Sequence, residues 1–313
     1  MELRKDYILD RWVFLASERK IRPREFKTDA KEQKAQICYF CPGNEHLTPP
    51  ESGRIGKEKW KIRWFPNKFP AMALEGNPIV KTDNKYFTFS DSYGKHEVIA
   101  ETRDHDKQLW DLPEEDIREI LEVYNNRIQE LSRIPNVKYV LVFKNHGEEA
   151  GTSLIHSHTQ VAAVNIMPVL IQEEVAASKR YNSCPYCEII SVEKQSYRRC
   201  FENDSFVAFT PYASRFNYEI WIFPKRHLRA LNELTKEELD DCADILTKVV
   251  RKLKELNVSY NYYLHYSPEN EDLHFHIEVA PRIATWAGFE LGSEAVINSV
   301  SPEDAARFYR GEK

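Results

Sequence analysis

Paired cysteines and alternating histidines are the residues of this sequence best suited to chemistry, and each pattern occurs twice. The cysteine pairs have two intervening residues, and they are Cys38 with Cys41 and Cys184 with Cys187. The histidine pairs have one intervening residue, and they are His156 with His158 and His274 with His276. A tetrahedral structural zinc takes thiolate and imidazole ligands, and a Cys-x-x-Cys pair commonly supplies two of the four. The repetition predicts two zinc sites.

Each half of the chain offers one set of four ligands. The first set is Cys38, Cys41, His105 and His156, and the second set is Cys184, Cys187, His227 and His274. Four protein ligands close the coordination sphere, so we expect both metals to be structural, with an aspartate or glutamate as the alternative to one ligand. The competing interpretation is a thioredoxin-like redox pair, which sits at a strand-to-helix turn. The sequence indicates a helix directly after neither pair, which favours zinc.

His158 is the candidate nucleophile. If residues 155–161 form a strand, His156 and His158 point to one face, because side chains two residues apart share a face. With His156 on the metal, His158 is left to react, and neutral imidazole is a good nucleophile toward phosphorus near pH 7. Gln160 shares that face and can form a hydrogen bond with an oxyanion. The pattern predicts chemistry at a phosphate, where positioning and charge stabilisation matter most.

The loop before this strand also suits a phosphate, whereas the matching loop of the second half does not. Asn145-His146-Gly147 and Gly151-Thr152-Ser153 offer small residues, backbone amides and hydroxyls. In the second half His276 takes the place of His158, but Glu278 stands where Gln160 stands, and a carboxylate repels a phosphate. The loop 268–272 is acidic and lacks glycine. We therefore expect the nucleophile in the first half alone.

The same order of elements positions these residues in both halves. A buried strand precedes one metal-binding histidine, an amphipathic helix follows, and two further strands complete each half. The expected strands are 96–100, 137–143, 155–161, 218–222, 260–265 and 273–279, the helical faces are 117–131 and 239–253, and a connecting helix is 171–179. This order predicts an α+β fold with helices packed on antiparallel sheets. We expect two tandem domains, residues 1–170 and 171–313, related by a pseudo-twofold repeat.

The composition excludes several classes of protein. The 313 residues include 44 Lys and Arg and 49 Asp and Glu, so the net charge of −5 argues against general attraction to nucleic acid or anionic membranes. Hydrophobic residues make up 42% of the chain, which is enough for a folded core. We find no apolar run long enough to span a membrane and no apolar signal segment. We therefore expect a cytoplasmic protein, in which paired thiols bind metal rather than form disulfides.

Four further stretches complete the pattern. Asp10-Arg11-Trp12-Val13 is followed by Arg19 and Arg22-Pro23, and a turn follows at Phe65-Pro66-Asn67-Lys68-Phe69-Pro70. An active-site stretch contains, in order, Asn145, Gly151, Ser153, His156, His158 and Gln160, and Phe289-Glu290 lies near the end. In these stretches the chain resembles the galactose-1-phosphate uridylyltransferase family of the histidine-triad superfamily. The resemblance covers most of the chain and implies two histidine-triad-like domains in a homodimer.

The resemblance also implies a reaction and roles for the matched residues. His158 would attack the α-phosphorus of UDP-glucose to form a uridylyl-histidine, and galactose 1-phosphate would then take the uridylyl group, in a ping-pong transfer. Gln160 and Ser153 would bind phosphoryl oxygens, in the stretch that includes Gly151. Asn67 and Asn145 would contact the nucleotide. Arg19 and Arg22 would reach a site from the partner subunit, or would be solvated charges. Glu290 would bind hexose hydroxyls.

Three departures from the family pattern leave a second activity open. The common His-Pro-His-Gly-Gln is His156-Ser157-His158-Thr159-Gln160 here, Phe289-Glu290 replaces the frequent Tyr-Glu, and the second half keeps its cysteine pair. The last two features also resemble ADP-glucose phosphorylase, which uses the same histidine but passes AMP to inorganic phosphate. The alternative function is therefore an adenylyl transfer from ADP-glucose to phosphate.

Two other classes of function compete less well. A zinc-ribbon module that binds nucleic acid or protein would also contain two Cys-x-x-Cys pairs. The basic residues are scattered, however, and form no stripe interleaved with aromatic residues. A histidine-triad hydrolase is the remaining alternative. The partners that we expect are a nucleotide sugar and a hexose 1-phosphate, with neither nucleic acid nor membrane.

Overall fold

Residues 1–5, 12–15 and 37–312 are described by the computed structural model, and the chain divides into two compact units. The first unit comprises Met1–Lys107, Val123–Val142 and Ser153–Glu174, and the second comprises Gln108–Glu122, Phe143–Thr152 and Val175–Lys313. Helix α1 and strand β8 each contribute residues to both units. In the described part of the chain, no helix has both the length and the apolar character needed to cross a membrane.

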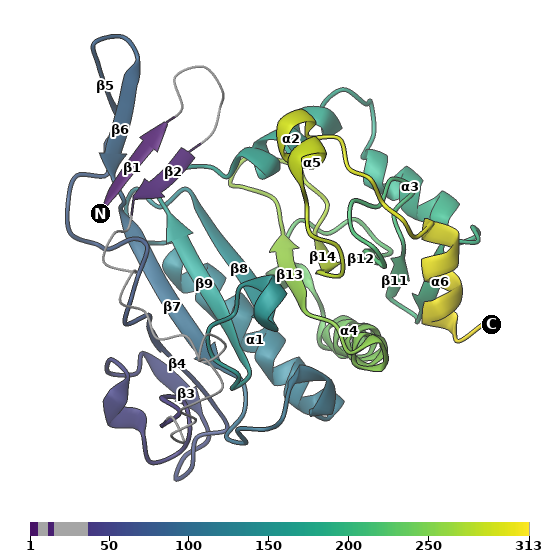
Figure 1. Ribbon diagram of the computed structural model, residues 1–313, viewed down its shortest axis with the longest axis horizontal. Coiled ribbons are helices and arrows are strands. Elements are labelled where there is room, and N and C mark those ends of the chain that lie inside the picture. Colours follow the sequence, from purple (N-terminus) through teal and green to yellow (C-terminus); the bar gives the residue numbers. More distant parts are fainter. Residues whose placement is uncertain (6–11, 16–36, 313) are drawn as a thin grey trace. The chain divides into compact units, whose positions relative to one another are not determined.

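The first unit is built mainly from antiparallel strands (Figure 1). Its strands are β1 (Glu2–Lys5), β2 (Trp12–Leu15), β3 (Gly53–Ile55), β4 (Ile62–Pro66), β5 (Lys81–Asp83), β6 (Phe87–Asp91), β7 (Gly94–Ala100), the start of β8 (Tyr139–His146) and β9 (His158–Val164). One sheet has the order β2-β1-β6-β5, and the other runs β8-β9-β7-β4-β3. Strands β7 and β9 pair antiparallel along seven residues each, with Val98 opposite Gln160.

The pairing of β7 with β9 places the candidate nucleophile at the start of a buried strand. All seven residues of β9 are buried, as are the last five of β7. Gly94 opens β7 with a φ of +145°, and a Cβ at this position would clash with the carbonyl oxygen of Ala163. Only glycine tolerates both conditions, so it allows the two strands to approach this closely. Phe40, Phe65 and Val98 belong to the core cluster beside them.

The second unit combines antiparallel strands with most of the helical residues (Figure 1). Its elements are the first part of α1 (Glu114–Leu131), the end of β8, the end of α2 (Val169–Ser178), α3 (Pro185–Glu193), β10 (Arg199–Glu202), β11 (Phe206–Phe209), β12 (Ile220–Pro224), α4 (Lys236–Leu256), β13 (Tyr260–His265), β14 (His276–Pro281), α5 (Gly288–Ser293) and α6 (Pro302–Arg310). The strands have the order β10-β11-β12-β14-β13, and the end of β8 pairs antiparallel with β13.

Helix α4 illustrates how the sequence specifies its own ends. Thr235 caps the N-terminus by accepting from the backbone of Glu238, whose side chain accepts from the backbone of Thr235 in return. Asn257 ends the helix in the left-handed conformation. The buried face includes Ala243, Leu246, Val249, Val250 and Leu253, which were expected from their spacing, and packs against β10, β11 and β12.

The repeated order of elements is confirmed: β7, α1, β8 and β9 match β12, α4, β13 and β14 along the chain. The α+β fold with antiparallel sheets is confirmed as well. Three local predictions were wrong. Asn145 and His146 lie at the end of β8 instead of in the loop that follows it. Strands β9 and β14 begin at His158 and His276, so His156 and His274 precede their strands instead of lying within them. Cys184 caps helix α3 directly, so the second cysteine pair does open a helix.

Candidate active site and metal centres

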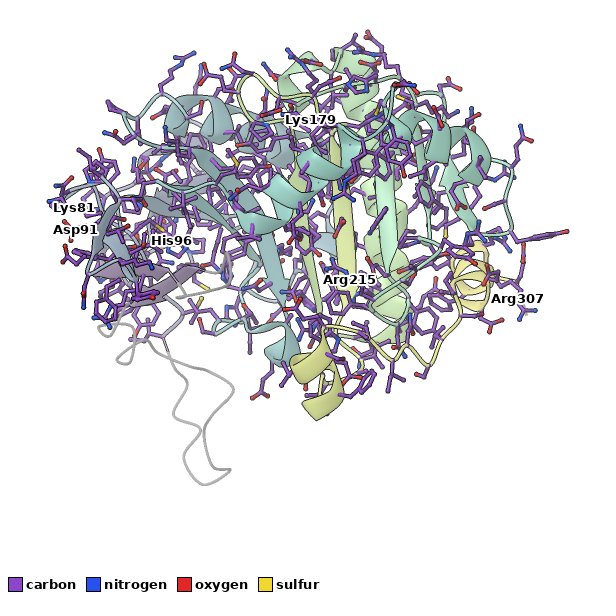
Figure 2. All side chains as sticks on the ribbon, turned by 90° about the horizontal axis from the view of Figure 1, so that it is seen from above. Lys81, Asp91, His96, Lys179, Arg215 and Arg307 are labelled. Carbon is purple, nitrogen blue, oxygen red and sulfur yellow. The ribbon has the colours of Figure 1, made fainter. Side chains whose placement is uncertain are left out.

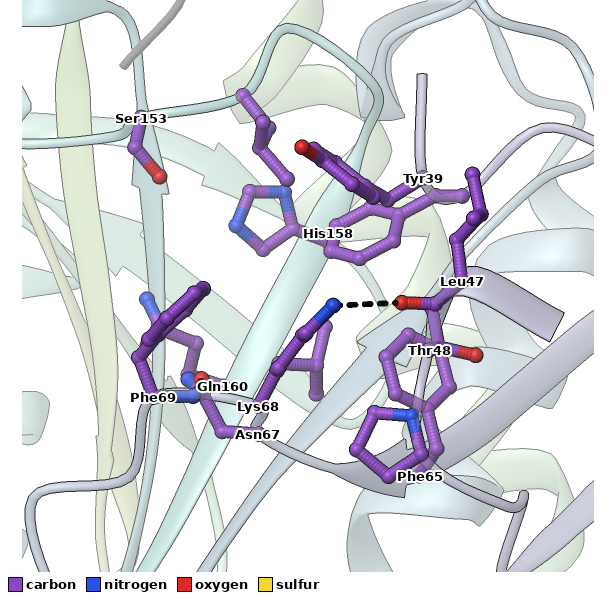
Figure 3. Close-up of a pocket in the computed structure, with 14 residues that line it drawn as sticks. Tyr39, Leu47, Thr48, Phe65, Asn67, Lys68, Phe69, Ser153, His158 and Gln160 are labelled. Carbon is purple, nitrogen blue, oxygen red and sulfur yellow. Dashed lines mark hydrogen bonds between the residues drawn. The ribbon is translucent and has the colours of Figure 1, made fainter. Parts of the chain in front are cut away.

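A pocket in the first unit contains the candidate nucleophile. It is lined by aromatic, aliphatic and polar residues, namely Tyr39, Phe40, Leu47, Thr48, Pro49, Phe65, Asn67, Lys68, Phe69, Val98, Ser153, Leu154, His158 and Gln160. Figure 3 shows the imidazole of His158 in the midst of these side chains. Lys68 reaches across toward the carbonyl oxygen of Leu47, at 3.4 Å. Apolar walls with a few convergent polar groups are typical of a small-molecule site.

A backbone carbonyl group two residues earlier in the chain holds the imidazole of His158 in one tautomer. Its Nδ1 lies 2.8 Å from the carbonyl oxygen of His156, which can only accept, so Nδ1 carries the proton. The lone pair of the neutral ring is therefore on Nε2. The ring is 5% exposed and meets the edge of Phe40, with ring centroids 5.3 Å apart. A buried, fixed imidazole with its lone pair on a known atom suits nucleophilic attack.

A buried carboxylate fixes the opposite face of the same strand. Glu101 follows β7, is 1% exposed, and accepts hydrogen bonds from three hydroxyl groups. Ser157 and Thr159 each donate to it at 2.6 Å, and Tyr124 donates at 3.0 Å. The hydroxyl oxygens of Tyr124 and Thr159 also lie 2.7 Å apart, but each has one proton, so neither can donate to the other while both donate to Glu101. Ser157 and Thr159 are the residues that flank His158, so this carboxylate fixes the strand at the nucleophile.

Replacing Glu101 by alanine is expected to destabilise the first unit strongly. Without Glu101, Tyr124 can donate to Thr159 instead, so two of the three buried hydroxyl groups lose their acceptor, and each unsatisfied polar group costs about 1–3 kcal/mol. We expect a loss of about 3–5 kcal/mol, measured by urea denaturation. Glu101→Gln is the matched variant, because its amide keeps one oxygen acceptor and should lose clearly less. Equal, small losses of stability in both variants would contradict the proposal that Glu101 holds the start of β9 in place.

The four cysteine and histidine side chains of the first predicted metal set converge. The Sγ of Cys41 lies 3.4 Å from Nδ1 of His105 and 3.6 Å from Nδ1 of His156, and Sγ of Cys38 lies 3.6 Å from the latter. Zinc–sulfur and zinc–nitrogen bonds of ordinary length at a tetrahedral angle place S and N about 3.6 Å apart. Nε2 of His156 lies 2.8 Å from the carbonyl oxygen of Thr102, which leaves Nδ1 as the ligand atom.

The second set converges in the same way. The Sγ of Cys187 lies 3.5 Å from Nδ1 of both His227 and His274, and Sγ of Cys184 lies 3.8 Å from Nδ1 of His274. Nε2 of His227 contacts Asp272 at 2.8 Å, which orients the ring as in many metal sites. Burial lowers the pKa of His274 to about 4, and burial with the neighbouring Cys184 raises the pKa of Cys187 to about 12. A neutral imidazole can bind a metal ion directly. A divalent cation would offset the free-energy cost of deprotonating the cysteine thiols.

The second His-x-His motif is enclosed. His276 is 0% exposed and stacks on Phe223 with ring centroids 4.7 Å apart. Glu278 lies 3.7 Å from Nε2 of His276 and 3.4 Å from a guanidinium nitrogen of Arg215. Together with His265, His276 and Glu278 form a group whose side chains could also hold a cation. A carboxylate and full burial at this position leave no room for a phosphate, in line with the expectation from the sequence.

The remaining predicted site residues are spread over both units. Ser153 and Asn67 line the pocket. Asn145, on β8, accepts a hydrogen bond from Asn261 at 2.8 Å, and Gly151 adopts a φ of +82° in the turn that follows. Glu290, in α5, accepts from the backbone of Ala287 at 3.0 Å. Within the described residues, these last three are not among those that line the pocket. The positions of Asp10, Arg11, Arg19, Arg22 and Pro23 lie outside the described residues.

Sequence reasoning missed several residues of the site. Tyr39, Phe40 and Lys68 line the pocket, yet they lie beside motifs that were interpreted for other reasons, a cysteine pair and a turn. His96 was assigned no role from the sequence, but its Nε2 lies 3.0 Å from Oε1 of Gln160. The signal that could have pointed to His96 was its place in β7, the strand that pairs with β9. Without the register, nothing in the sequence pairs these two side chains.

Comparison with known proteins agrees with this geometry. A family model described as the N-terminal domain of galactose-1-phosphate uridyl transferase matches residues 2–168, and one described as a domain of unknown function (DUF4921) matches residues 93–307. ADP-glucose phosphorylase of Arabidopsis thaliana is 32% identical over 328 residues, covering 99% of this chain and 92% of that protein. Galactose-1-phosphate uridylyltransferase of Thermotoga maritima is 31% identical over 329 residues, covering 99% of this chain and 98% of that protein.

A solved structure described as that of a uridylyltransferase superposes with a TM-score of 0.82 at 29% identity. The match covers 99% of this chain and 98% of that one, so the fold is shared from end to end. The family model matches more than half of the chain, and relatives above 30% identity match nearly all of it. This chain therefore belongs to the galactose-1-phosphate uridylyltransferase family of transferase enzymes.

Proposed function

We propose that this protein transfers the uridylyl group of UDP-glucose to galactose 1-phosphate, through a covalent intermediate on His158. The observation that carries the proposal is the fixed tautomer of His158 in a pocket, with Nδ1 bonded to the carbonyl oxygen of His156 and the lone pair on Nε2. Membership of the family and the relative from Thermotoga maritima support the choice of substrates.

In the first half-reaction Nε2 of His158 attacks the α-phosphorus of UDP-glucose. The nitrogen–phosphorus bond forms while the bond from the α-phosphorus to the bridging oxygen breaks, and the electron pair leaves with glucose 1-phosphate. The proton on Nδ1 stays in place, so the ring becomes positively charged when Nε2 is substituted. The carbonyl oxygen of His156, 2.8 Å away, accepts that proton's hydrogen bond and stabilises the charge.

In the second half-reaction a phosphate oxygen of galactose 1-phosphate attacks the same phosphorus. The oxygen–phosphorus bond forms, the nitrogen–phosphorus bond breaks, and neutral His158 is regenerated with UDP-galactose as the product. Both steps pass through a transition state with negative charge spread over the phosphoryl oxygens. In this proposal, Gln160 and Ser153 bind those oxygens, and the ammonium group of Lys68 adds positive charge at the same pocket.

The other proposed contacts follow from the matched motifs. Asn67 and Asn145 would contact the nucleotide, and Gly151 would bind substrate. Glu290 would bind the hexose hydroxyls. Arg19 and Arg22 would complete a site across a homodimer. We further propose that residues 1–170 and 171–313 are tandem histidine-triad-like domains, a division supported by the repeated order of elements.

We also propose that each half holds one structural zinc ion. The first site would use Cys38, Cys41, His105 and His156, and the second Cys184, Cys187, His227 and His274. Support comes from the sulfur–nitrogen distances and from the bonds that orient the histidine rings. When bound, zinc would cross-link segments that are distant in the sequence and would not act as a Lewis acid. All six cysteines are free, which fits a reducing compartment, and on that ground we propose a cytoplasmic location.

Changing Gln160 to glutamate is expected to slow formation of the uridylyl-enzyme by about 10²–10³-fold, because an amide donor to the developing oxyanion becomes a repelling carboxylate. The side chain keeps its size, so the fold should be retained. Stopped-flow measurement of glucose 1-phosphate release over one turnover gives the rate. Gln129→Glu, on α1, is a matched control in the same unit, away from the pocket lining. A Gln160→Glu rate within threefold of the control would contradict the proposed role.

A second candidate function is favoured by one relative. ADP-glucose phosphorylase of Arabidopsis thaliana is as similar to this chain as the uridylyltransferase of Thermotoga maritima. In that case His158 would take an adenylyl group from ADP-glucose and pass it to inorganic phosphate. The nucleophile and the metal sites would be the same, and only the donor base and the acceptor would differ.

Product analysis with matched substrate pairs distinguishes the two functions. The enzyme is incubated with UDP-glucose and galactose 1-phosphate, and separately with ADP-glucose and phosphate, and nucleotides are separated by chromatography. We expect UDP-galactose in the first reaction and no ADP in the second. Formation of ADP from ADP-glucose and phosphate, without UDP-galactose, would assign the chain to the phosphorylase.

A further inference from the structure

His96 makes a contact with the active-site pocket that none of the roles above uses. It lies on β7, is 5% exposed, and is labelled in Figure 2. Its Nε2 lies 3.0 Å from Oε1 of Gln160, a residue that lines the pocket with His158. The strand register places Val98 opposite Gln160, so His96 reaches Gln160 from two residues along the neighbouring strand.

The surroundings of His96 determine which of its nitrogens carries the proton. The backbone N–H of Ala71 points at Nδ1, with a nitrogen–nitrogen distance of 3.3 Å. A backbone N–H can only donate, so Nδ1 must accept and cannot itself be protonated in the neutral ring. The proton is therefore on Nε2. The oxygen of Gln160 is the natural acceptor for that proton.

This hydrogen bond decides which end of the Gln160 amide faces the pocket. With Oε1 held by the N–H of His96, the two N–H donors of Gln160 are directed away from His96. In the flipped orientation the amide would place its N–H₂ against the N–H of His96 and its oxygen toward the pocket. An oxygen there would repel a phosphoryl group, whereas an N–H₂ group can donate to it.

We propose that His96 is a positioning residue that orients the Gln160 amide so that it presents hydrogen-bond donors to the transferred phosphoryl group. The effect on the reaction rests on the proposed function. The orientation of the Gln160 amide rests on the tautomer of His96. Asn67 takes no part in this hydrogen bond, because its side-chain N–H₂ group faces the protonated Nε2 and two donors cannot bond each other. Its Oδ1 accepts from the backbone of Phe69 at 2.9 Å, and its Nδ2 lies 3.4 Å from Nε2 of His96.

Two amide substitutions at His96 give a matched test. In His96→Gln the side-chain N–H₂ can occupy the place of Nε2 and still donate to Gln160. In His96→Asn the shorter side chain can reach only the place of Nδ1. We expect nucleotidyl-enzyme formation to slow about 10- to 100-fold in His96→Asn and less than about fivefold in His96→Gln, since complete removal of such a donor costs about 10²–10³-fold and a misoriented amide loses part of that. Thermal unfolding of both variants reports on any general loss of structure.

A double-mutant cycle shows whether His96 acts through Gln160. In a Gln160→Ala background there is no amide to orient, so His96→Asn should slow the reaction no further. Equal fold-losses from His96→Asn in both backgrounds would overturn the proposal, as would equal rates for His96→Asn and His96→Gln. The cycle is measured with UDP-glucose and with ADP-glucose, because orientation of the amide does not depend on the donor base.

Failure of the proposed function is recognised separately. If the wild-type protein forms no nucleotidyl-enzyme with either donor, the proposed reaction fails while the structural part of the inference is still tested. Nitrogen-15 NMR of the histidine side chains reports the tautomer of His96 without any substrate. A neutral ring protonated on Nε2 supports the inference, and a ring protonated on Nδ1 overturns it.

Discussion

Replacing His158 by alanine is expected to lower the rate of transfer by on the order of 10⁴–10⁶, the range seen when a covalent nucleophile is removed. Ser153 and Gln160 line the same pocket, but a hydroxyl and an amide are poor nucleophiles without a neighbouring base. The loss should appear in the first half-reaction, as release of glucose 1-phosphate from UDP-glucose without an acceptor. Rapid quench of a single turnover measures this step. The protein should remain folded, because the ring makes one backbone hydrogen bond and edge contacts.

His46→Ala is a suitable control for His158→Ala, since His46 is exposed and was not assigned a role. We expect its rate to match the wild type. If His158→Ala retained more than a hundredth of the wild-type rate, then another residue would be the nucleophile, or transfer would be direct. Inversion of configuration at a chiral α-phosphorus would then be expected, in place of the retention that two successive displacements produce.

Loss of one cysteine ligand in the first half is expected to have the second largest effect. Cys38→Ser should remove one of two zinc ions, measured by atomic absorption, and should abolish transfer as well. Structural zinc contributes about 10–16 kcal/mol of apparent folding energy in small domains, which equals the whole stability of many proteins. Even if the remaining interactions compensate for part of this energy, the free energy of unfolding should fall by about 5 kcal/mol, so Tm should fall by roughly 10–20 °C. Activity should be lost because ligand His156 is two residues before His158.

Cys200→Ser and Cys184→Ser provide the comparison for this prediction. Cys200 is buried away from both metal sets, with its thiol bonded to the carbonyl oxygen of Arg198 at 3.4 Å, so its replacement should leave both zinc ions. Cys184→Ser should remove the second zinc ion and destabilise the second half. Retention of two zinc ions in Cys38→Ser, or a stable wild-type protein that binds no metal, would refute the assignment.

The sequence predicted the parts of the site that depend on spacing. Cysteine pairs and the histidines after them recur at matching places, and their side chains do converge. The faces of α1 and α4 followed from apolar residues three and four apart, because that period belongs to the helix alone. Strand β13 was predicted with its observed ends, since three of the six residues from Tyr260 to His265 are tyrosines, which favour strands.

The parts that depend on register or on tertiary contacts could not be predicted. Alternation in His156-Ser157-His158 fits a strand, but the ring of His156 bonds the carbonyl oxygen of Thr102, and β9 begins only at His158. Ser157 and Thr159 were visible only as departures from a family pattern. Their hydroxyls donate to Glu101, a residue more than fifty positions earlier, and no local signal links them. The bond from His96 to Gln160 was missed for the same reason.

His158 is expected to carry a nucleotidyl group during the reaction. The most direct test is mass spectrometry of the intact protein after mixing with UDP-glucose in the absence of an acceptor, followed by mapping of the modified peptide. One uridylyl group per chain is expected on the peptide that contains His158, with loss of that group on addition of galactose 1-phosphate and no adduct in His158→Ala. An unmodified protein that nevertheless converts its substrates, or an adduct on a different residue, would contradict this expectation.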